Sequence, residues 1–267
     1  MHNATMYCLS LDDKVLPIIK KLGYVPVGLG SNKFSEEWLR DNTLEHISHK
    51  NKYYSEYTFN YWFWKNILPK LEDNNWVGFC AYRRFWLDNK KKLTEESKIE
   101  DIAIKEIPSE WKNFDTIIGD HIYINNLKLS KLVKHGIFSL IRNPSALFKS
   151  RRNIRFHFDM WHGNGNLDKA IDLLNDNNRE DFRKYTRQNV SFSQGCMFVC
   201  RSKKIMNNYF SSLFPWLERC EKIFGFNLKG YGNVRIYAFL AERYHSYWFH
   251  KYTKPLTWPI IFYDTSK

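Results

Sequence analysis

Two neighbouring arginines, Arg83 and Arg84, are the side chains best suited to hold a phosphorylated ligand. An arginine can make paired, charge-assisted hydrogen bonds to phosphate without the help of a metal ion. Both follow Tyr82 at the end of an apolar run, and adjacent residues of an extended strand point to opposite faces. We therefore expect one arginine to face the ligand and the other to stabilise the sheet. The alternative is that both form only structural ion pairs.

A second group of residues could transfer a proton. Asp159 lies between His157 and His162 in the segment RFHFDMWH. A carboxylate or an imidazole can take the proton of an attacking hydroxyl group. Glu242 is the rival base, although an ion pair with its neighbour Arg243 explains it more simply. The three residues of the segment could instead bind a metal ion, but their spacing is not specific for one.

An aromatic helix and a buried strand must position the arginines. Ser55 is placed to cap the start of the helix. The predicted inward stripe recurs at spacings of three and four and consists of Tyr57, Tyr61, Trp64 and Leu68. Residues 76–82, WVGFCAY, then predict a short buried strand. Open α/β sheets bind ligands at the carboxyl ends of their strands, so these two elements predict one side of a ligand-binding cleft.

The rest of the chain predicts further elements of an α/β protein. Strand, helix and strand patterns follow one another in the first 30 residues, which suits a parallel sheet. The polar run 88–110 predicts an exposed insertion, and residues 114–124 return to strand character. Beyond a loop at 162–166, the patterns predict a helix over 167–174, a strand over 191–200, and helices over 202–224 and 233–249.

Composition sets the size and class of the protein. With 267 residues, 43% hydrophobic and 17% aromatic, the chain can bury a sizeable core within one α/β domain. The first residues lack a basic start followed by an apolar run, and no segment approaches the ~20 apolar residues that cross a bilayer. We therefore expect a cytoplasmic protein. Its five cysteines are odd in number and lie mostly among apolar neighbours, which predicts free, buried thiols.

The formal net charge of +13 predicts an anionic partner, which could be a nucleotide diphosphate, a lipid surface or nucleic acid. Residues 121–158 contain no Asp or Glu. Their basic residues include Lys128, Lys131, Lys134, Arg142, Lys149, Arg151, Arg152 and Arg155. An apolar stripe runs through the same stretch and consists of Leu129, Leu132, Val133, Ile137, Leu140 and Ile141. This pattern predicts either a helix on an anionic membrane surface or a basic helix packed on the core. Nucleic acid is not expected, because no binding motif accompanies the charge.

Five motifs occur in a characteristic order between residues 41 and 84. They are Asp41-Asn42, Ile47-Ser48-His49-Lys50-Asn51, Glu56-Tyr57-Thr58, Tyr61-Trp62-Phe63-Trp64-Lys65-Asn66 and Gly78-Phe79-Cys80-Ala81-Tyr82-Arg83-Arg84. In this order the chain resembles bacterial and viral glycosyltransferases of capsule, O-antigen and related surface-polysaccharide loci, a family first catalogued as a domain of unknown function. Gln194-Gly195-Cys196-Met197-Phe198-Val199 and Phe239-Leu240-Ala241-Glu242-Arg243 resemble its later motifs. Ala81 departs from the pattern, which usually has a histidine there.

The resemblance implies a GT-A-like α/β fold with a mixed, mainly parallel sheet and a helical C-terminal part. It implies a single domain over 1–267, with a donor-binding half at 1–125 and an acceptor half at 126–267. The implied donor-binding residues are Asp41, Asn42, Lys50, Asn51, Glu56, Trp62, Lys65, Asn66, Tyr82, Arg83 and Arg84. The expected acceptor-binding residues are His162, Gln194 and Gly195. The proton-transfer chemistry described above makes Asp159, His157 and Glu242 the candidate catalytic residues.

The same resemblance suggests UDP-galactofuranose or another UDP-sugar as donor and a saccharide or lipid-linked saccharide as acceptor. Many GT-A enzymes hold a divalent cation with an Asp-x-Asp motif, which this sequence lacks. We therefore expect no required metal, with stimulation by Mn²⁺ or Mg²⁺ left open. Two other functions stay open as well: a catalytically inactive carbohydrate-binding relative, and a basic nucleic-acid-binding protein.

Overall fold

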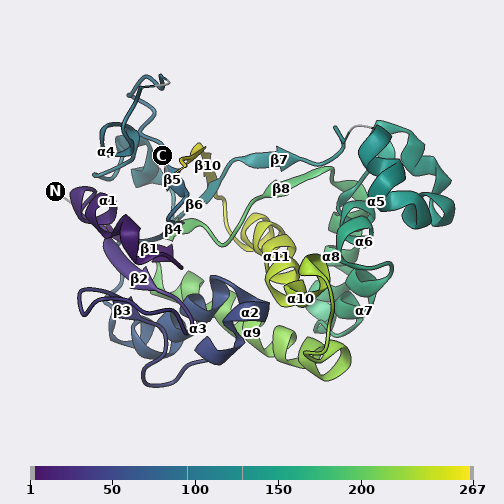
Figure 1. Ribbon diagram of the computed structural model, residues 1–267, viewed down its shortest axis with the longest axis horizontal. Coiled ribbons are helices and arrows are strands. Elements are labelled where there is room, and N and C mark those ends of the chain that lie inside the picture. The colour runs from purple at the N-terminus through teal and green to yellow at the C-terminus, as the bar shows by residue number, and fades with distance from the viewer. Residues whose placement is uncertain (1–3, 95, 128, 265–267) are drawn as a thin grey trace. The chain divides into compact units, whose positions relative to one another are not determined.

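The computed structural model describes residues 4–94, 96–127 and 129–264 (Figure 1). The chain forms two compact units. The first unit runs from the N-terminal residues to Asp120 and also includes Gly195–Ser211 and the residues from Phe249 onward. The second unit consists of His121–Gln194 and Ser212–Trp248. None of the helices in the described residues is long and apolar enough to cross a membrane.

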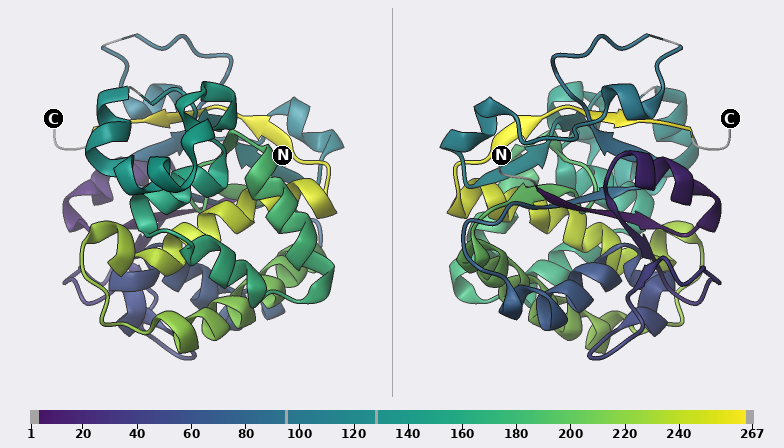
Figure 2. Two further views of the ribbon diagram at one scale, coloured as in Figure 1. Left: turned by 90° about the vertical axis from the view of Figure 1, so that its right-hand side faces the viewer. Right: turned by 90° about the vertical axis from the view of Figure 1, so that its left-hand side faces the viewer.

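A mixed, mainly parallel sheet is the centre of the first unit. In chain order its strands are β1 (Thr5–Ser10), β2 (Val25–Gly28), β3 (Leu39–Arg40), β4 (Val77–Ala81), β5 (Arg84–Trp86), β6 (Thr116–Gly119), β9 (Phe198–Cys200), β10 (Leu256–Trp258) and β11 (Ile260–Phe262). The spatial order is β10-β6-β9-β4-β1-β2-β3, and β5 pairs with both β4 and β11. Strand β1 is parallel to β2 and β4, whereas β9 is antiparallel to β4 and β6. The C-terminal strands, yellow in Figure 2, lie beside β5 and β6.

Aromatic packing fixes helix α3 (Tyr57–Asn66) against this sheet. Phe59 and Phe63 of α3 contact Tyr7 of β1 at ring-centroid distances of 5.3 and 5.6 Å. The other α-helices of the unit are α1 (Leu16–Lys21), α2 (Asn51–Tyr54) and α4 (Ile99–Ile102). Short 3-10 turns are Asp13–Val15, Ser48–Lys50, Leu68–Lys70 and Ser109–Asn113.

The second unit is largely helical. Its strands β7 (His121–Tyr123) and β8 (Ser191–Ser193) form an antiparallel pair. Its helices are α5 (Leu129–Arg142), α6 (Ile154–His162), α7 (Asn166–Asp172), α8 (Asp176–Gln188) and α10 (Tyr231–Val234), with 3-10 turns at Pro144–Leu147 and Lys149–Arg151. Helix α9 (Lys203–Phe224) belongs to this unit from Ser212 onward. Helix α11 (Ile236–Tyr252) belongs to it up to Trp248. Phe182 of α8 lies among Trp216, Tyr244 and Tyr247 in its core.

The predicted strand, helix and strand at the start of the chain are confirmed as β1, α1 and β2. The predicted inward stripe of α3 is confirmed at Tyr57 and Leu68, which are buried, and wrong at Tyr61 and Trp64, which are half-buried. The buried aromatic residues of the helix also include Phe59, Trp62 and Phe63. Aromatic residues occupy every side of this helix, so apolar spacing did not distinguish the inward face. All five cysteines are free and buried, as predicted.

Two local predictions are also wrong. Ser55 does not cap α3: the N-cap residue is Glu56, and its side chain accepts no capping hydrogen bond from the backbone N–H groups of the first turn. Ser55 has a positive φ of 53°, and its hydroxyl donates to the Glu56 carboxylate. The predicted strand over 191–200 is divided into β8 and β9, which belong to different sheets. Gly195, between them, has a φ of 76°, which interrupts the extended conformation.

Candidate active-site regions

A cavity of about 420 Å³ lies at the carboxyl ends of β1 and β2 in the first unit. Parallel sheets bind ligands at this edge, and the volume is within the range of small-molecule sites. The residues that line it are Leu11, Leu29, Gly30, Ser31, Asn32, Asn42, Ser48, His49, Asn51 and Lys52. Of the predicted donor-binding residues, Asn42 and Asn51 therefore line a ligand-sized cavity.

The buried carboxylate of Asp41 forms hydrogen bonds behind the residues that line this cavity. Its Oδ1 accepts a hydrogen bond from the Gly30 N–H at 3.2 Å, and its Oδ2 accepts one from the Thr58 hydroxyl at 2.6 Å. Asn51 Nδ2 donates to the same Thr58 oxygen at 3.1 Å. Burial raises the pKa of Asp41, and these hydrogen bonds oppose the shift. The network joins the ends of β2 and α3 to the cavity wall.

The backbone conformation and the surroundings of Gly30 favour a glycine. Its φ is 65°, and a Cβ placed on it would lie 3.2 Å from the side chain of Asn51. A larger residue would be strained in its backbone and would push Asn51 away from the cavity. The sequence motifs named Asn51 but gave no sign of this contact.

Two buried residues of α3 hold the loop that carries Asn42. Trp62 Nε1 donates to the Thr43 carbonyl at 2.7 Å, and Asn66 Nδ2 donates to the Glu45 carbonyl at 2.9 Å. Trp62 is 3% exposed, and its ring stacks on Phe59. In the structure both residues contact the loop backbone.

The remaining polar residues of the motif lie around the same loop and helix. Lys65 Nζ is 3.2 Å from a carboxylate oxygen of Glu45 and 4.3 Å from the centre of the Trp64 ring. Lys50 Nζ is 5.9 Å from the Tyr54 ring, and Glu56 accepts from the Ser55 hydroxyl. Lysine and histidine side chains at the cavity itself were missed by the sequence analysis: they are Lys52 and His49. The sequence offered one sign that they lie at the cavity: His49 directly follows Ser48, and Lys52 directly follows Asn51.

Tyr82 and Arg83 form a tight turn between β4 and β5, in which Ala81 pairs with Arg84. The strand predicted over residues 76–82 is confirmed as β4, but Arg83 and Arg84 are not neighbours in one extended strand, so simple alternation does not decide which arginine faces a ligand. Arg83 is 45% exposed and lies 3.7 Å from Asp264. The Tyr82 N–H donates to the Leu9 carbonyl near the end of β1, so the turn is at the same edge of the sheet as the cavity.

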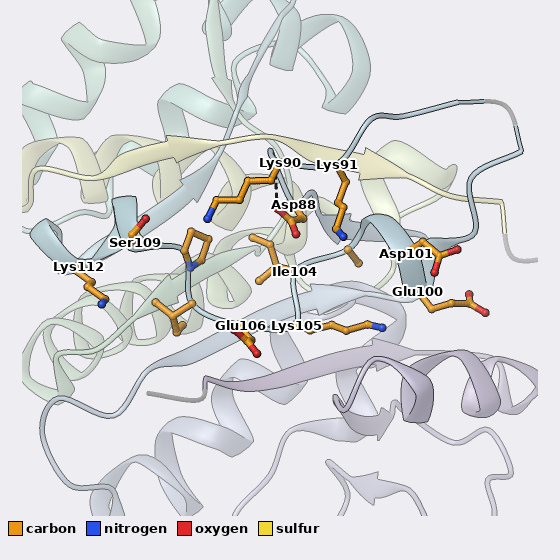
Figure 3. Close-up of a pocket in the computed structure, with 13 residues that line it drawn as sticks. Asp88, Lys90, Lys91, Glu100, Asp101, Ile104, Lys105, Glu106, Ser109 and Lys112 are labelled. Atoms are coloured by element: carbon orange, nitrogen blue, oxygen red, sulfur yellow. Dashed lines mark hydrogen bonds between the residues drawn. The ribbon is translucent and has the colours of Figure 1, made fainter. Parts of the chain in front are cut away.

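A different cavity, of about 680 Å³, lies within the segment between β5 and β6 (Figure 3). Strand β5 runs antiparallel to β4, so this segment is at the amino ends of the parallel strands. Its charged lining residues are Asp88, Lys90, Lys91, Glu100, Asp101, Lys105, Glu106 and Lys112. Both lysines and carboxylates line it, and its position is opposite to the edge where parallel sheets bind ligands.

The candidate proton-transfer residues lie on α6 of the second unit. Asp159 Oδ1 accepts from the Gly165 N–H at 3.0 Å, and burial raises the pKa of Asp159. His162 Nδ1 lies 2.9 Å from the Gly232 carbonyl, and its ring stacks on Phe239 with centroids 4.0 Å apart. Burial, with a smaller effect of Arg243, lowers the pKa of His162 to about 3. The imidazole is therefore neutral and donates to Gly232.

His157 and Glu242 are brought together by Arg243, which is 2% exposed. Arg243 pairs with Glu242, and its Nη2 donates to His157 Nδ1 at 3.3 Å. Its guanidinium carbon also lies 4.2 Å from the centre of the Phe192 ring. Burial, followed by the charge of Arg243, lowers the pKa of His157 well below its usual value. An arginine only donates, so His157 uses its Nδ1 lone pair to accept this bond.

The alternative of a metal site on α6 is not supported by these contacts. His157 and Asp159 point about 200° apart around the helix axis. Among the residues that the structure describes, no group of three His, Cys, Asp or Glu side chains is arranged to hold a metal ion. Gln194 and Gly195 lie where the chain passes from the second unit to the first, and the Gly195 carbonyl accepts from the Tyr57 hydroxyl at 3.4 Å.

The α/β, GT-A-like fold predicted from the sequence is confirmed by comparison with solved structures. The chain is similar to the apo structure of the WbbM bifunctional glycosyltransferase, with a TM-score of 0.69 and 19% sequence identity. The similarity covers 98% of this chain and 46% of that protein, so the chain spans about half its length. A family model matches residues 9–254, and the chain belongs to that family, the Domain of unknown function DUF4422. No curated protein matches the chain.

Proposed function

We propose that this protein is a glycosyltransferase that moves a hexose from a nucleotide-sugar donor to a saccharide or lipid-linked saccharide. The observation that carries the proposal is the cavity at the carboxyl ends of β1 and β2, which Asn42 and Asn51 line. Amide side chains and backbone groups can recognise the edge of a base and the hydroxyls of a ribose. The GT-A-like fold and the similarity to a glycosyltransferase structure support the same class of reaction.

The donor we propose is a UDP-sugar, with UDP-galactofuranose as the first candidate because of the motif resemblance. Its departing diphosphate gains negative charge in the transition state. The turn that carries Arg83 and the adjoining Arg84 lies at the same sheet edge as the cavity. One of these two guanidinium groups then neutralises the diphosphate through paired hydrogen bonds. We propose that Tyr82 and Lys50 assist at the same edge, while Lys65 holds the loop that carries Asn42 through its ion pair with Glu45.

Within the second unit, Asp159 is the residue that we propose as a general base, since its local contacts leave it better suited than its neighbours His157, His162 and Glu242. His157 Nδ1 already accepts a hydrogen bond from Arg243, and His162 is buried with a pKa of about 3. Glu242 is held in an ion pair with Arg243. A carboxylate with a raised pKa accepts a proton more readily, which suits Asp159 for removing the proton of the acceptor hydroxyl. In this scheme His157 and Glu242 position the surrounding groups.

The proposal is tested by replacing Arg83 and Arg84 separately with lysine. Lysine keeps the charge but loses the bidentate geometry, and loss of a charge-assisted hydrogen bond costs about 1.5–3 kcal/mol. One of the two variants should therefore lose roughly ten- to a hundredfold in kcat/KM for transfer from UDP-sugars. Arg201→Lys is the matched control, because Arg201 follows the antiparallel β9 at the opposite edge of the sheet and pairs with Asp115. Parent-like kinetics in both lysine variants would refute the assignment.

A catalytically inactive, carbohydrate-binding relative is the second candidate. The observation in its favour is Ala81, which occupies the position where the motif usually has a histidine. Such a protein would show thermal stabilisation by UDP-sugars or saccharides but neither transfer nor donor hydrolysis. Measuring melting temperature and turnover on the same panel of UDP, GDP and CDP sugars distinguishes the two.

A further inference from the structure

Helix α5 of the second unit has one face packed in the interior and another that is exposed. Leu132 is fully buried and packs with Ala146, Phe156 and Met160. Gly136 lies against α6 so closely that a Cβ on it would be 2.8 Å from Met160 Sδ. The packed side of the predicted apolar stripe therefore faces the core of the unit. The side chains of Leu129 and Val133 are outside the described part of the chain, as are those of Lys131 and Lys134 and the whole of Lys128.

A second apolar surface, which we call the 137–148 patch, consists of Ile137, Phe138, Ile141, Leu147 and Phe148. Phe138 is 72% exposed, Ile141 70% and Phe148 71%. Burying a side chain of this size is worth about 1.5–3 kcal/mol, so leaving several exposed together carries a considerable cost in water. A soluble surface rarely concentrates large apolar residues in this way unless they contact something.

The turn that presents Leu147 and Phe148 is held by a buried arginine. Arg152 donates from its Nε to the Ala146 carbonyl at 2.9 Å and from its Nη2 to the Leu147 carbonyl at 3.0 Å. Its Nη1 donates to the Leu127 carbonyl at 2.9 Å. One cation of the acid-free stretch is thus used to fix the backbone that displays the patch.

Only positive charge surrounds the 137–148 patch in sequence. Arg142, Lys149 and Arg151 are exposed, and residues 121–158 contain no Asp or Glu. Exposed aromatic and branched side chains flanked by cations match the boundary between anionic headgroups and acyl chains. Each basic residue near such a surface adds about 1 kcal/mol of attraction.

We propose that the 137–148 patch inserts into the surface of an anionic lipid bilayer and holds the second unit there. Phe138, Ile141 and Phe148 enter the headgroup and acyl boundary, while Arg142, Lys149 and Arg151 contact lipid phosphates. The purpose of this membrane binding rests on the proposed function, because a transferase held at the membrane surface meets a lipid-linked acceptor there. The binding itself does not depend on catalysis.

Co-sedimentation with vesicles tests the proposal. The 267-residue protein should pellet with vesicles of phosphatidylcholine and phosphatidylglycerol but not with phosphatidylcholine alone. High salt should release it, because exposed charges are then screened. The double variant Phe138→Ser/Phe148→Ser should lose at least about tenfold in vesicle affinity, because two buried aromatic contacts are removed. The triple variant Arg142→Gln/Lys149→Gln/Arg151→Gln should lose the preference for anionic lipid.

Ile223→Ser is the matched control, since Ile223 is an exposed apolar residue of the second unit outside the patch. It should bind vesicles like the parent. Equal pelleting with both lipid types, no pelleting with either, or an equal loss in the control would overturn the proposal. Binding to soluble polyglutamate in preference to anionic vesicles would assign the patch to an acidic protein partner instead.

Transfer to a soluble saccharide without vesicles separates this proposal from the proposed function. The serine double variant should retain that activity, and circular dichroism should show an unchanged fold. Vesicle binding without any transfer would support membrane binding by the 137–148 patch and refute the proposed glycosyltransferase activity. Transfer without vesicle binding would support the activity and refute membrane binding.

Discussion

At the scale of single residues, buried histidines of α6 are held in their neutral forms. His162 lies between the Phe158 and Phe239 rings and donates to the Gly232 carbonyl. Its pKa is about 3, far below the ordinary value of 6.5. The pKa of His157 is lowered in the same direction. These shifts make protein stability depend on pH in a defined direction.

Acidification should therefore destabilise the protein through His162. Below pH 6.5 the unfolded chain binds a proton at this imidazole while the folded chain does not, so stability is lost as the pH falls toward about 3. The loss is about 1.4 kcal/mol per pH unit for one histidine. His162→Gln keeps an N–H donor without titrating, so urea denaturation between about pH 7 and pH 4 should show a shallower dependence of unfolding free energy on pH.

His49→Gln is the control for that experiment, because it replaces an exposed histidine in the first unit. Its pH dependence should stay like that of the parent. An identical slope for the parent and His162→Gln would show that His162 is protonated in the folded state.

At the scale of elements, α3 and the loop before it act together. Asn66, a buried residue of α3, donates to the carbonyl of Glu45 and accepts from its N–H, so one side chain satisfies both backbone groups of that loop residue. The same loop carries Asn42 into the cavity wall. Loss of this side chain should therefore affect both stability and ligand binding.

Asn66→Ala should lower the unfolding free energy by roughly 1–3 kcal/mol, the cost of leaving buried polar groups unsatisfied. It should also reduce the rise in melting temperature that UDP causes, since Asn42 is no longer held in place. Asn89→Ala, at an exposed position outside the loop, is the control. Undiminished stabilisation by UDP in Asn66→Ala would mean that the loop does not shape the nucleotide site.

The sequence predicted the existence of these elements better than their orientation. Apolar runs located β1, β2 and β4, because buried parallel strands are continuously apolar. The phase of α3 could be read only in part, because Tyr61 and Trp64 are aromatic like Phe59 and Phe63. In the structure the Tyr61 hydroxyl and the Trp64 N–H reach Glu45 and Asn207. These hydrogen-bond partners lie in segments distant in the chain, so the sequence pattern of α3 alone could not predict them.

The candidate site was predictable to a similar extent. Asn42, Asn51 and Arg83 belong to motifs whose residue types indicated ligand contacts, and the structure places all three at one edge of the sheet. The turn at Tyr82 and Arg83 was missed because it contains neither glycine nor proline. The role of Arg243 was missed as well, because an Arg beside a Glu on a helix resembles an ordinary surface pair.

At the scale of the whole molecule, the proposed chemistry uses arginine where related folds use a metal ion. The sequence has no Asp-x-Asp motif, and Arg83 and Arg84 stand at the proposed diphosphate edge. Transfer should therefore continue in EDTA at close to its original rate, with at most weak stimulation by Mn²⁺ or Mg²⁺. Activity that disappears in EDTA and returns on adding Mn²⁺ would contradict this prediction.

The first unit is built from three separate stretches of chain, and the last stretch supplies β10 and β11. During synthesis from the N-terminus, β6 and β5 keep an unpaired edge until residues 256–262 have emerged from the ribosome. All residues of the second unit are synthesised before that point. The inserted unit can thus finish folding before the unit that it interrupts, the reverse of the usual N-terminal-first order. Premature termination near residue 250 would release a chain with a completed second unit and an open, aggregation-prone sheet.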